Sequence, residues 1–301
     1  MVAVVFLSVA FVKAATVVLQ PVADTTLIET APNNNMGGTG FVNAGTAGSS
    51  GGRNRGLFKF DLSSIPRNSK ITSATLHLGV IQSPDTGAQS SLFTLRRMLR
   101  NWGEGNKDST QAPSPGLGLP AEINEATWNS PFALTTNSWS APGAANDFIS
   151  SASSSAPVDP LSAFPIFNST TQMVSDAQLW TVNPSTNFGW LLKTESENIA
   201  RTARRFGSRE FAGIDTNSPP FVEITFVPPP VLNSLTVTNG QFRFSFFAET
   251  NQTYLVQFRT SLATTNIWQT FTNIPAQSVA TNLSISDSIS TNVRFYRVAA
   301  P

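Results

Sequence analysis

Short apolar segments separated by turn residues run along the chain from residue 16 onward. In KITSATLHLGVI (residues 70–81), Ala74, Leu76 and Leu78 alternate with Thr75 and His77, which is the period-two pattern of a strand with one buried face. Further strands are predicted in TVVLQPVADTTLIE (16–29), RGLFKFDLSSIP (55–66), NFGWLLKT (187–194), RRFGSREF (204–211) and PPFVEITFV (219–227). This pattern indicates an all-β protein with a jelly-roll-like β-sandwich.

The pattern changes at three consecutive prolines, residues 228–230. Proline cannot continue a sheet ladder, so we predict a linker there between a sandwich over residues 16–227 and a second module over residues 231–301. In the second part, Asn239 and Gly240 stand between two alternating segments and predict a hairpin. IWQTFTNI (267–274), TNLSISDS (281–288) and VRFYRVAA (293–300) add three strands. The second module therefore fits a small immunoglobulin-like or fibronectin type III-like sandwich.

Residues 103–165 are rich in Gly, Pro, Ser and Asn and predict long loops. These loops carry Trp128 and Trp139, and loops on a rigid sandwich are common places for binding. Two roles stay open for these side chains: they stack on a bound sugar, or they cover the core beneath the loops.

The composition of the chain excludes several kinds of catalytic and metal site. The chain has 301 residues, of which 12% are charged, a net charge of +1, no Cys, and His77 as its one histidine. Disulfides, thiol nucleophiles and thiolate metal sites are thereby excluded, and nothing favours nucleic acid as a partner. The apolar run at residues 2–12 resembles a signal-peptide core, so residues 1–15 are either a signal peptide or the lead-in to the first strand. With no second long apolar run, we expect a secreted protein without a transmembrane segment.

Several ordered fragments resemble one family. They are ADTTLIETAPNNNMGG, RGLFKFDLSSIPRNSKITSATLHL, RNWGEG, EATWNS, WSAPGAANDF, NFGWLLK, and FGSREF followed by PPFVEITF. Together they are similar to the DNRLRE domain, an extracellular module of bacteria and archaea, over roughly residues 20–227. The resemblance implies a sandwich like that of carbohydrate-binding modules, some relatives of which bind alginate, and it implies no catalytic residues.

The stretch RTARRFGSREF (201–211) concentrates charge in a chain that has little. If it is a strand, Phe206 and Glu210 share the inner face, and Glu210 then needs a charge-assisted partner. Arg53, Arg55 and Arg96 are the candidates for that partner. Arg205 and Arg209 would share the opposite face, where they either contact acidic groups of a ligand or are ordinary solvated charges.

Catalysis and metal binding have weaker signals. Nucleophilic catalysis by Ser needs a histidine and an orienting acid, and the one histidine, His77, lies within an ordinary strand. Glycoside hydrolysis needs only two carboxylates, and the acids available for it are Glu104, Glu122, Glu125 and Glu210. Asp24, Glu29 and residues 33–35 border one loop region where a structural calcium could bind, although the sequence assigns no ligands.

These observations predict a non-catalytic extracellular polysaccharide-binding or adhesion protein. Its site residues would be Arg205, Arg209, Trp128 and Trp139, and its partner an acidic polysaccharide. The alternative is a self-associating structural subunit of a surface layer, filament or matrix, since edge strands support assembly by strand addition. A polysaccharide-active enzyme is a third, weaker hypothesis.

Overall fold

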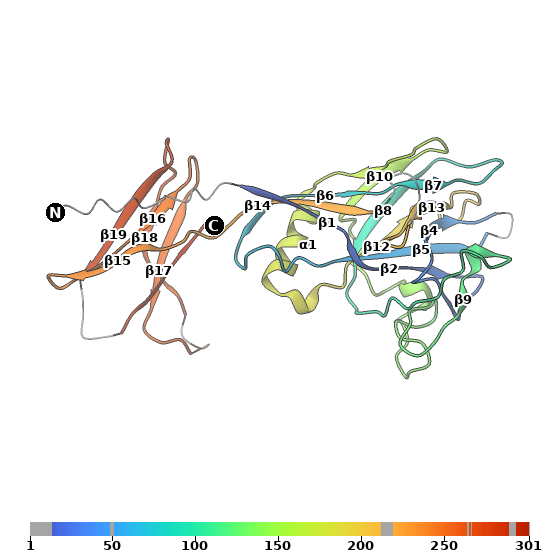
Figure 1. The fold of residues 1–301 in the computed structure, drawn as a ribbon, viewed down its shortest axis with the longest axis horizontal. Coiled ribbons are helices and arrows are strands. Elements are labelled where there is room, and N and C mark those ends of the chain that lie inside the picture. Colours follow the sequence, from blue (N-terminus) through green and yellow to red (C-terminus); the bar gives the residue numbers. More distant parts are fainter. Residues whose placement is uncertain are drawn as a thin grey trace, which may run out of the picture. The chain divides into compact units, whose positions relative to one another are not determined.

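The computed structural model of the chain describes residues 14–48, 51–211, 219–263, 265, 267–288 and 293–300. Strands dominate these residues, which hold one α-helix, α1 (Thr171–Val182) (Figure 1). The predicted all-β fold is therefore confirmed. The predicted signal peptide falls almost wholly outside the described residues. No helix in the described ranges is both long and apolar enough to cross a membrane.

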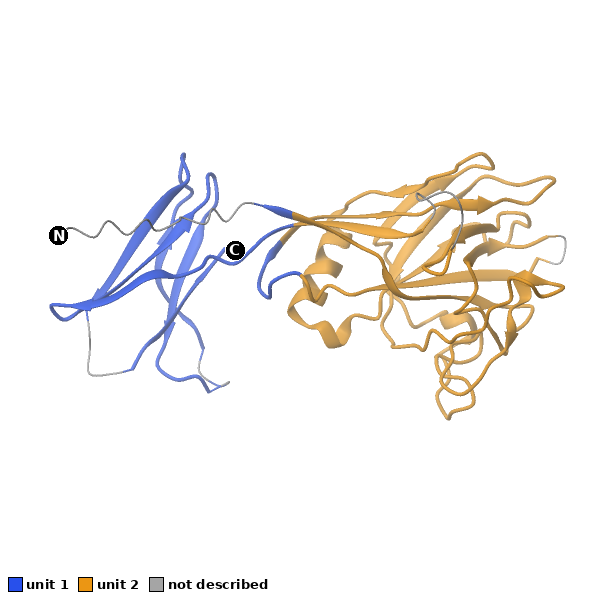
Figure 2. Cartoon of the chain, in the orientation of Figure 1, with its two compact units in different colours: residues 1–15, 65–70, 226–301 blue, residues 16–64, 71–225 orange. Residues whose placement is uncertain are grey.

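Contacts within the chain divide it into two compact units (Figure 2). The larger unit comprises Thr16–Ser64 and Ile71–Thr225, and the smaller one comprises Met1–Ala15, Ile65–Lys70 and Phe226–Pro301. The division falls within β14 (Phe221–Val227), just before the three prolines that the sequence predicts as a linker. These prolines belong to no strand, and the next strand, β15, begins at Asn233.

Two main sheets form the larger unit. The eight-stranded sheet has the order β10 (Ser154–Val158), β8 (Ser91–Arg97), β12 (Trp190–Thr194), β5 (Arg53–Phe60), β4 (Phe41–Thr46), β13 (Arg204–Gly207) and β7 (Val80–Gln82), with β2 (Pro21–Ile28) also paired to β5. The four-stranded sheet has the order β1 (Ala15–Leu19), β14, β6 (Lys70–His77) and β11 (Ile166–Phe167). Short elements complete the unit: β3 (Asn34–Asn35) paired to β9 (Leu119–Pro120), and the 3-10 helices η1 (Pro115–Leu117), η2 (Pro142–Ala144) and η3 (Pro184–Thr186).

The strand pattern read from the sequence is confirmed in β6. Ala74 and Leu76 are fully buried, whereas Thr75 and His77 are partly exposed. His77 stacks on Phe221 of the neighbouring strand, with ring centroids 4.4 Å apart, and burial lowers its pKa. This histidine is thus part of a sheet surface, as its place in the sequence suggested.

The first predicted strand is two strands in different sheets. It breaks between Leu19 and Pro21: β1 joins the four-stranded sheet, and β2 pairs with β5. Proline has no N–H to donate to a ladder, which makes the start of a strand one of the few positions where a sheet tolerates it. The chain changes sheets at this point.

The helix α1 is absent from the sequence prediction. Thr170 caps it, since its hydroxyl accepts the N–H of Met173 at 3.0 Å. Asp176 is 1% exposed and accepts hydrogen bonds from Arg97 Nε at 2.9 Å and Trp190 Nε1 at 3.0 Å. These charge-assisted bonds fasten the helix to the eight-stranded sheet.

The loop-rich segment that follows β8 is held to the sheet by a buried amide. Asn35 is fully buried, and its Nδ2 donates to the carbonyls of Glu104 at 2.7 Å and Ala126 at 2.9 Å. Gly103 passes so close to the backbone of Asn124 that a Cβ atom would lie 1.8 Å from its carbonyl oxygen. The loops are therefore packed against the sheet and hold Glu104 in a defined place.

The smaller unit contains two three-stranded antiparallel sheets with apolar residues between them. One has the order β15 (Asn233–Thr238), β16 (Gln241–Ala248) and β19 (Thr281–Ser288), and the other β18 (Gln269–Ile274), β17 (Tyr254–Arg259) and β20 (Phe295–Ala299). Asn239 and Gly240 have φ of 52° and 72°, the left-handed values that a two-residue type I′ hairpin needs. The predicted hairpin is confirmed.

Candidate functional site

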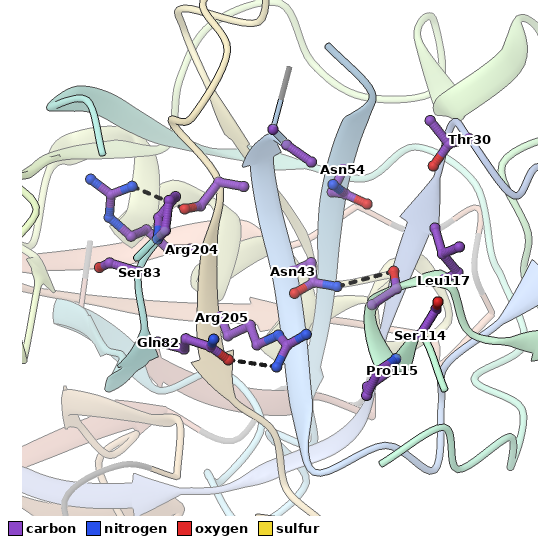
Figure 3. A pocket seen from close by; sticks show the side chains of 15 residues that line it. Thr30, Asn43, Asn54, Gln82, Ser83, Ser114, Pro115, Leu117, Arg204 and Arg205 are labelled. Atoms are coloured by element: carbon purple, nitrogen blue, oxygen red, sulfur yellow. Dashed lines mark hydrogen bonds between the residues drawn. The ribbon is translucent and has the colours of Figure 1, made fainter. Parts of the chain in front are cut away.

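A groove of about 420 Å³ opens on the larger unit (Figure 3). Strands β4, β5, β7 and β13 and the helix η1 contribute to its walls. Its amide and hydroxyl side chains are Thr30, Asn43, Asn54, Gln82, Ser83 and Ser114. Arg204 and Arg205 also line it, and none of the described lining residues is acidic. We call it the amide groove. Amides and hydroxyls both donate and accept hydrogen bonds, so they suit a ligand rich in hydroxyl groups.

Arg205 places an unneutralised positive charge at this groove. Its guanidinium lies over the ring of Phe41, 4.2 Å from the centroid, and its Nη1 donates to Gln82 Oε1 at 2.5 Å (Figure 3). No ion pair in the described part of the chain includes it. Burial lowers its pKa, and the charge of Asp85 opposes that shift. A guanidinium held flat and unpaired is ready for a planar carboxylate.

Asn54 supplies an acceptor with no partner. The residue is 7% exposed, and its Oδ1 is buried without a hydrogen bond from any described group. A buried polar atom that lacks a partner costs free energy, on the order of 1–3 kcal/mol. A ligand hydroxyl can donate to this oxygen only if the amide turns toward the groove, since the oxygen is closed to solvent in this structure.

Arg204 forms the deeper wall of the groove. It is 1% exposed, and its guanidinium donates to the carbonyls of Ala203 at 2.9 Å, Thr202 at 3.1 Å and Gln89 at 2.8 Å. Burial lowers its pKa. Carbonyl dipoles rather than a carboxylate stabilise this charge, so a net positive charge remains beside the groove.

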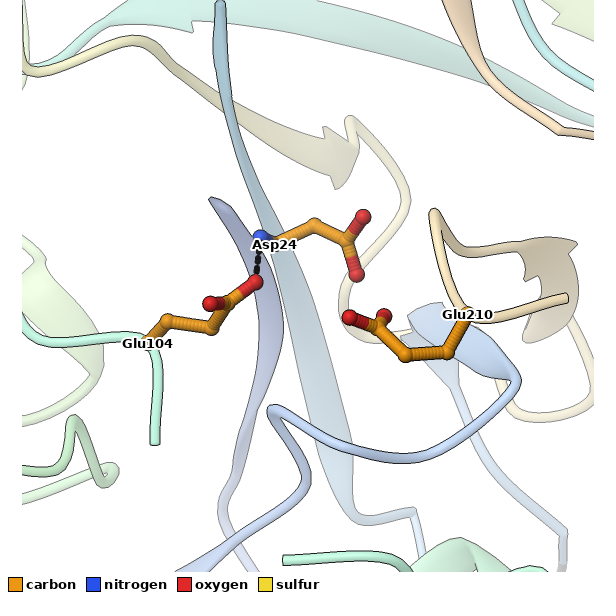
Figure 4. A group of neighbouring side chains, drawn as sticks. All are labelled: Asp24, Glu104 and Glu210. Carbon is orange, nitrogen blue, oxygen red and sulfur yellow. Dashed lines mark hydrogen bonds between the residues drawn. The ribbon is translucent and has the colours of Figure 1, made fainter. Parts of the chain in front are cut away.

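Three carboxylates meet elsewhere in the larger unit (Figure 4). Asp24, Glu104 and Glu210 each offer one oxygen atom, and these atoms lie within 4.8 Å of one another. Glu104 Oε1 accepts the N–H of Asp24 at 2.8 Å, and Asp24 Oδ2 accepts the N–H of Arg209 at 2.9 Å. We call these three residues the carboxylate cluster.

Arg209 supplies the positive charge of the carboxylate cluster. Its Nε and Nη2 donate to the two oxygens of Glu104 at 2.7 and 3.0 Å, and its Nε lies 2.7 Å from Glu210 Oε1. Such a two-pronged contact is the strong form of an arginine–carboxylate pair. Arg209 is therefore neutralised within the protein, in contrast to Arg205.

Burial raises the pKa of every carboxyl in the cluster. The effect is largest for Asp24, which is 1% exposed and whose pKa is raised further by the charges of Glu210 and Glu104. Burial also raises the pKa of Glu104 and of Glu210, while Arg209 opposes the shift in both. One arginine thus stands against three acids, and the charge imbalance favours uptake of a proton or another cation.

Among the described residues, the carboxylate cluster is the group of side chains that could hold a metal ion. Calcium takes six to eight oxygen ligands, and here Arg209 already occupies two oxygens of Glu104. Of the residues that border the loop singled out from the sequence, Asp24 alone belongs to the cluster, because Glu29 pairs with Arg53. A bound calcium therefore stays a prediction.

The four acids considered for glycoside hydrolysis separate into two places. Glu104 and Glu210 belong to the carboxylate cluster, whereas Glu122 pairs with Lys107 at 2.6 Å. Glu125 is buried and accepts the N–H groups of Asn106 at 3.1 Å and Glu122 at 2.7 Å. Backbone amides and cations of the protein thus occupy these carboxylates.

The predicted partners of Glu210 are wrong, because none of the three arginines pairs with it. The candidates Arg53, Arg55 and Arg96 pair instead with Glu29, Glu197 and Glu195. Glu210 pairs with its sequence neighbour Arg209, because β13 ends at Gly207 and the chain turns there. In this turn, the N–H of Phe211 donates to the carbonyl of Ser208 at 3.1 Å.

The same turn corrects the expectation that Arg205 and Arg209 share one strand face. Alternation holds from Arg204 to Gly207, with Arg204 and Phe206 buried and Arg205 partly exposed. Beyond Gly207 the strand geometry ends, and Arg209 joins the carboxylate cluster rather than the amide groove. The structure therefore separates the two arginines that the sequence placed together.

Trp128 and Trp139 are both 5% exposed and belong to a core cluster beneath the loops. Trp139 Nε1 donates to the carbonyl of Thr127 at 2.8 Å, and the guanidinium groups of Arg53 and Arg55 lie over the ring of Trp128. Of the two roles left open by the sequence, these positions favour covering the core, since a stacking platform for a sugar needs an exposed ring face.

Comparison with known proteins adds no identification. No protein-family model matches the chain, and no curated protein matches it either. Function must therefore be argued from the site itself.

The sequence pointed to Arg205 but not to the amides around it. Asn43, Asn54 and Gln82 come from three different strands, and only the pairing of β4, β5, β7 and β13 brings them together. A weak signal existed in RNRG (53–56), where Asn54 interrupts a strand between two arginines. A polar amide at a position where neighbouring residues are buried needs a partner, and that need marks a candidate site.

Proposed function

We propose that this protein is a non-catalytic extracellular polysaccharide-binding protein and that the amide groove is its binding site. The observation that carries the proposal is the groove's polar lining, which combines six amide and hydroxyl side chains with the unpaired Arg205 and has no acid among its described residues. Hydroxyl groups of a sugar match the amides, and a uronate carboxylate matches the guanidinium. The sequence resemblance to DNRLRE modules points in the same direction.

The proposal predicts an acidic rather than a neutral glycan. Arg204 and Arg205 give the groove a positive charge, and no lining side chain compensates it. Because exposed charges are screened, affinity for a uronate polymer should fall as salt rises. Within the described part of the chain no aromatic residue lines the groove, so a neutral polymer would lack the ring stacking that many sugar sites use.

A steric substitution tests the site without changing charge. A Cβ atom on Gly116 would lie 3.6 Å from Arg205 Nη2 and 3.7 Å from Asn43 Nδ2, both ordinary contact distances. Gly116→Ala should therefore retain binding, whereas Gly116→Leu should fill the groove, prevent binding there and reduce the retardation. The measurement is retardation in native gels that contain alginate or polygalacturonate, with a neutral galactan gel as the control. Unchanged retardation of Gly116→Leu would place the site elsewhere.

A second candidate function rests on β15 of the smaller unit. It is an edge strand, every residue in it is exposed, and Leu235 and Val237 are 61% and 66% exposed. Such an edge can pair with another chain, as a structural subunit would require. Size measurement in solution separates the two functions: a monomer with glycan affinity supports the binding protein, and regular assemblies without glycan affinity support the subunit.

A further inference from the structure

Two arginines and a tryptophan form a compact group on the outer face of the smaller unit. The guanidinium carbons of Arg259 and Arg297 lie 4.6 and 4.4 Å from the ring centroid of Trp268. Strand β17 lies between β18 and β20, with Phe258 opposite Gln269 and Gln257 opposite Arg297. We call Arg259, Trp268 and Arg297 the arginine–tryptophan surface.

Strand alternation places this group away from the core. Val256 of β17 is fully buried and Val298 of β20 is 8% exposed, and both belong to the core cluster of the unit. Arg259 is three residues after Val256, and Arg297 directly precedes Val298, so both project to the opposite face. Their charges therefore face solvent or a ligand.

In the described ranges no carboxylate neutralises these two arginines. Among the described residues, ion pairs include neither of them, and Asp287 pairs with Arg294 instead. From residue 226 onward the sequence has four arginines, no lysine and two acidic residues. Arg259 Nε is buried without a hydrogen-bond partner, and burial together with the charge of Arg259 lowers the pKa of Arg297. Two like charges held around one ring favour an anion between or beside them.

We propose that the arginine–tryptophan surface is an anion-binding site that takes carboxylate or sulfate groups of an acidic polysaccharide. It belongs to a different unit from the amide groove, and the proposal does not rest on that groove. A planar guanidinium binds a carboxylate or sulfate through two parallel hydrogen bonds. Because both units belong to one chain, a polymer that binds at both sites gains apparent affinity through effective concentration.

The chemistry favours a polysaccharide over a nucleic acid. The guanidinium groups of Arg259 and Arg297 both lie over the ring of Trp268, so they compete with a nucleic-acid base for stacking on it. A phosphate backbone is bound by a row of many cations, whereas this surface offers two. Isolated anionic groups spaced along a sugar polymer fit it better.

Tryptophan fluorescence offers a direct test in the full chain. The other five tryptophans, Trp102, Trp128, Trp139, Trp180 and Trp190, are at most 5% exposed, and Trp268 is partly exposed. Iodide, an anion, should quench Trp268 more than caesium does. We expect the ratio of iodide to acrylamide quenching to fall about twofold in Arg259→Gln/Arg297→Gln, because the local positive potential is lost.

Controls separate the site from a structural role. Arg100→Gln/Arg243→Gln removes the same number of charges elsewhere and should leave the ratio unchanged, and Trp268→Phe should remove the iodide-sensitive signal. Acrylamide is neutral and reports any change in the exposure of the ring. An iodide to acrylamide ratio that is equal in wild type and Arg259→Gln/Arg297→Gln would overturn the proposal.

A competition experiment distinguishes the sources of the anion. Polygalacturonate and dextran sulfate should protect Trp268 from iodide at monomer concentrations where galacturonate and inorganic sulfate do not. Equal protection by the small anions would reduce the site to a small-ion site and contradict a polysaccharide ligand. Stronger protection by a single-stranded oligonucleotide would also contradict it. Polygalacturonate should still protect Trp268 from iodide in Gly116→Leu. The experiment therefore tests the arginine–tryptophan surface even if the amide groove binds no glycan.

Discussion

Arg205 and Arg209 are four residues apart but differ in whether a carboxylate pairs with them. Arg205 lies over Phe41 at the amide groove with no acidic partner, whereas Arg209 is bound by Glu104 and Glu210 in the carboxylate cluster. The chain turns after Gly207, and this turn brings Arg209 beside acids from β2 and the loop after β8. Availability of a charge for ligands therefore depends on where distant carboxylates are placed, not on how many arginines a segment contains.

The largest effect should come from removing the paired arginine. Arg209→Gln leaves one buried and two partly buried carboxylates without their cation, so we expect the free energy of unfolding at pH 7 to fall by about 2–3 kcal/mol. Arg205→Gln breaks no ion pair and should cost less than about 1 kcal/mol. Urea denaturation of both variants measures the difference. Equal free energies of unfolding for Arg209→Gln and Arg205→Gln would contradict the distinction between a paired Arg209 and an unpaired Arg205.

The same contrast has a pH dependence. The pKa of Asp24, Glu104 and Glu210 is raised in the folded chain, so the folded state binds protons more tightly than the unfolded state, whose carboxyls titrate near about 4. Stability should therefore increase as pH falls from 7 to about 5 and decrease as pH rises through the folded pKa values.

A carboxyl whose pKa is lowered in the folded chain contributes to stability in the opposite sense. Its contribution is lost as pH falls, and this loss occurs at lower pH. Burial raises the pKa of Glu195, but hydrogen bonds from Thr94 and Arg96 outweigh burial and lower it to about 2. The contribution of Glu195 to stability is therefore lost only when pH falls below its pKa in the unfolded chain. Asp24→Asn keeps an acceptor for the N–H of Arg209 and should flatten the rise in stability between pH 7 and 5. The measurement is thermal unfolding across this range, and a slope in Asp24→Asn equal to that of wild type would contradict the role of the cluster.

The sequence predicted those parts of the fold that depend on local pattern. Period-two alternation located β6 and the strands of the smaller unit, and Asn239–Gly240 located a hairpin, because these signals need no partner far along the chain. Helix α1 was missed since Asp176 and Thr181 interrupt its buried stripe, which otherwise contains Met173, Ala177 and Trp180. The hydroxyl of Thr181 donates to the carbonyl of Ala177 within the helix, whereas Asp176 accepts from Arg97 and Trp190 on other elements, which the helix's own sequence does not reveal.

The candidate site was predictable only in part. Arg205 stood out because charge is rare in this chain, but its separation from Arg209 depends on a turn that strand alternation does not reveal. Asn43, Asn54 and Gln82 meet through strand pairing across long sequence separations. For Trp128 and Trp139 the sequence left two roles open, and only their burial in a core cluster, which local sequence does not reveal, favours the structural role.

The most direct test of the central claim compares the two arginines in one binding experiment. Wild type, Arg205→Gln, Arg209→Gln and Arg100→Gln are run in native gels containing polygalacturonate at low salt, at a temperature where circular dichroism shows all four folded. Binding at the amide groove predicts that Arg205→Gln loses most of its retardation, while Arg209→Gln and Arg100→Gln keep that of wild type. Loss of retardation in Arg209→Gln with full retention in Arg205→Gln would contradict the account.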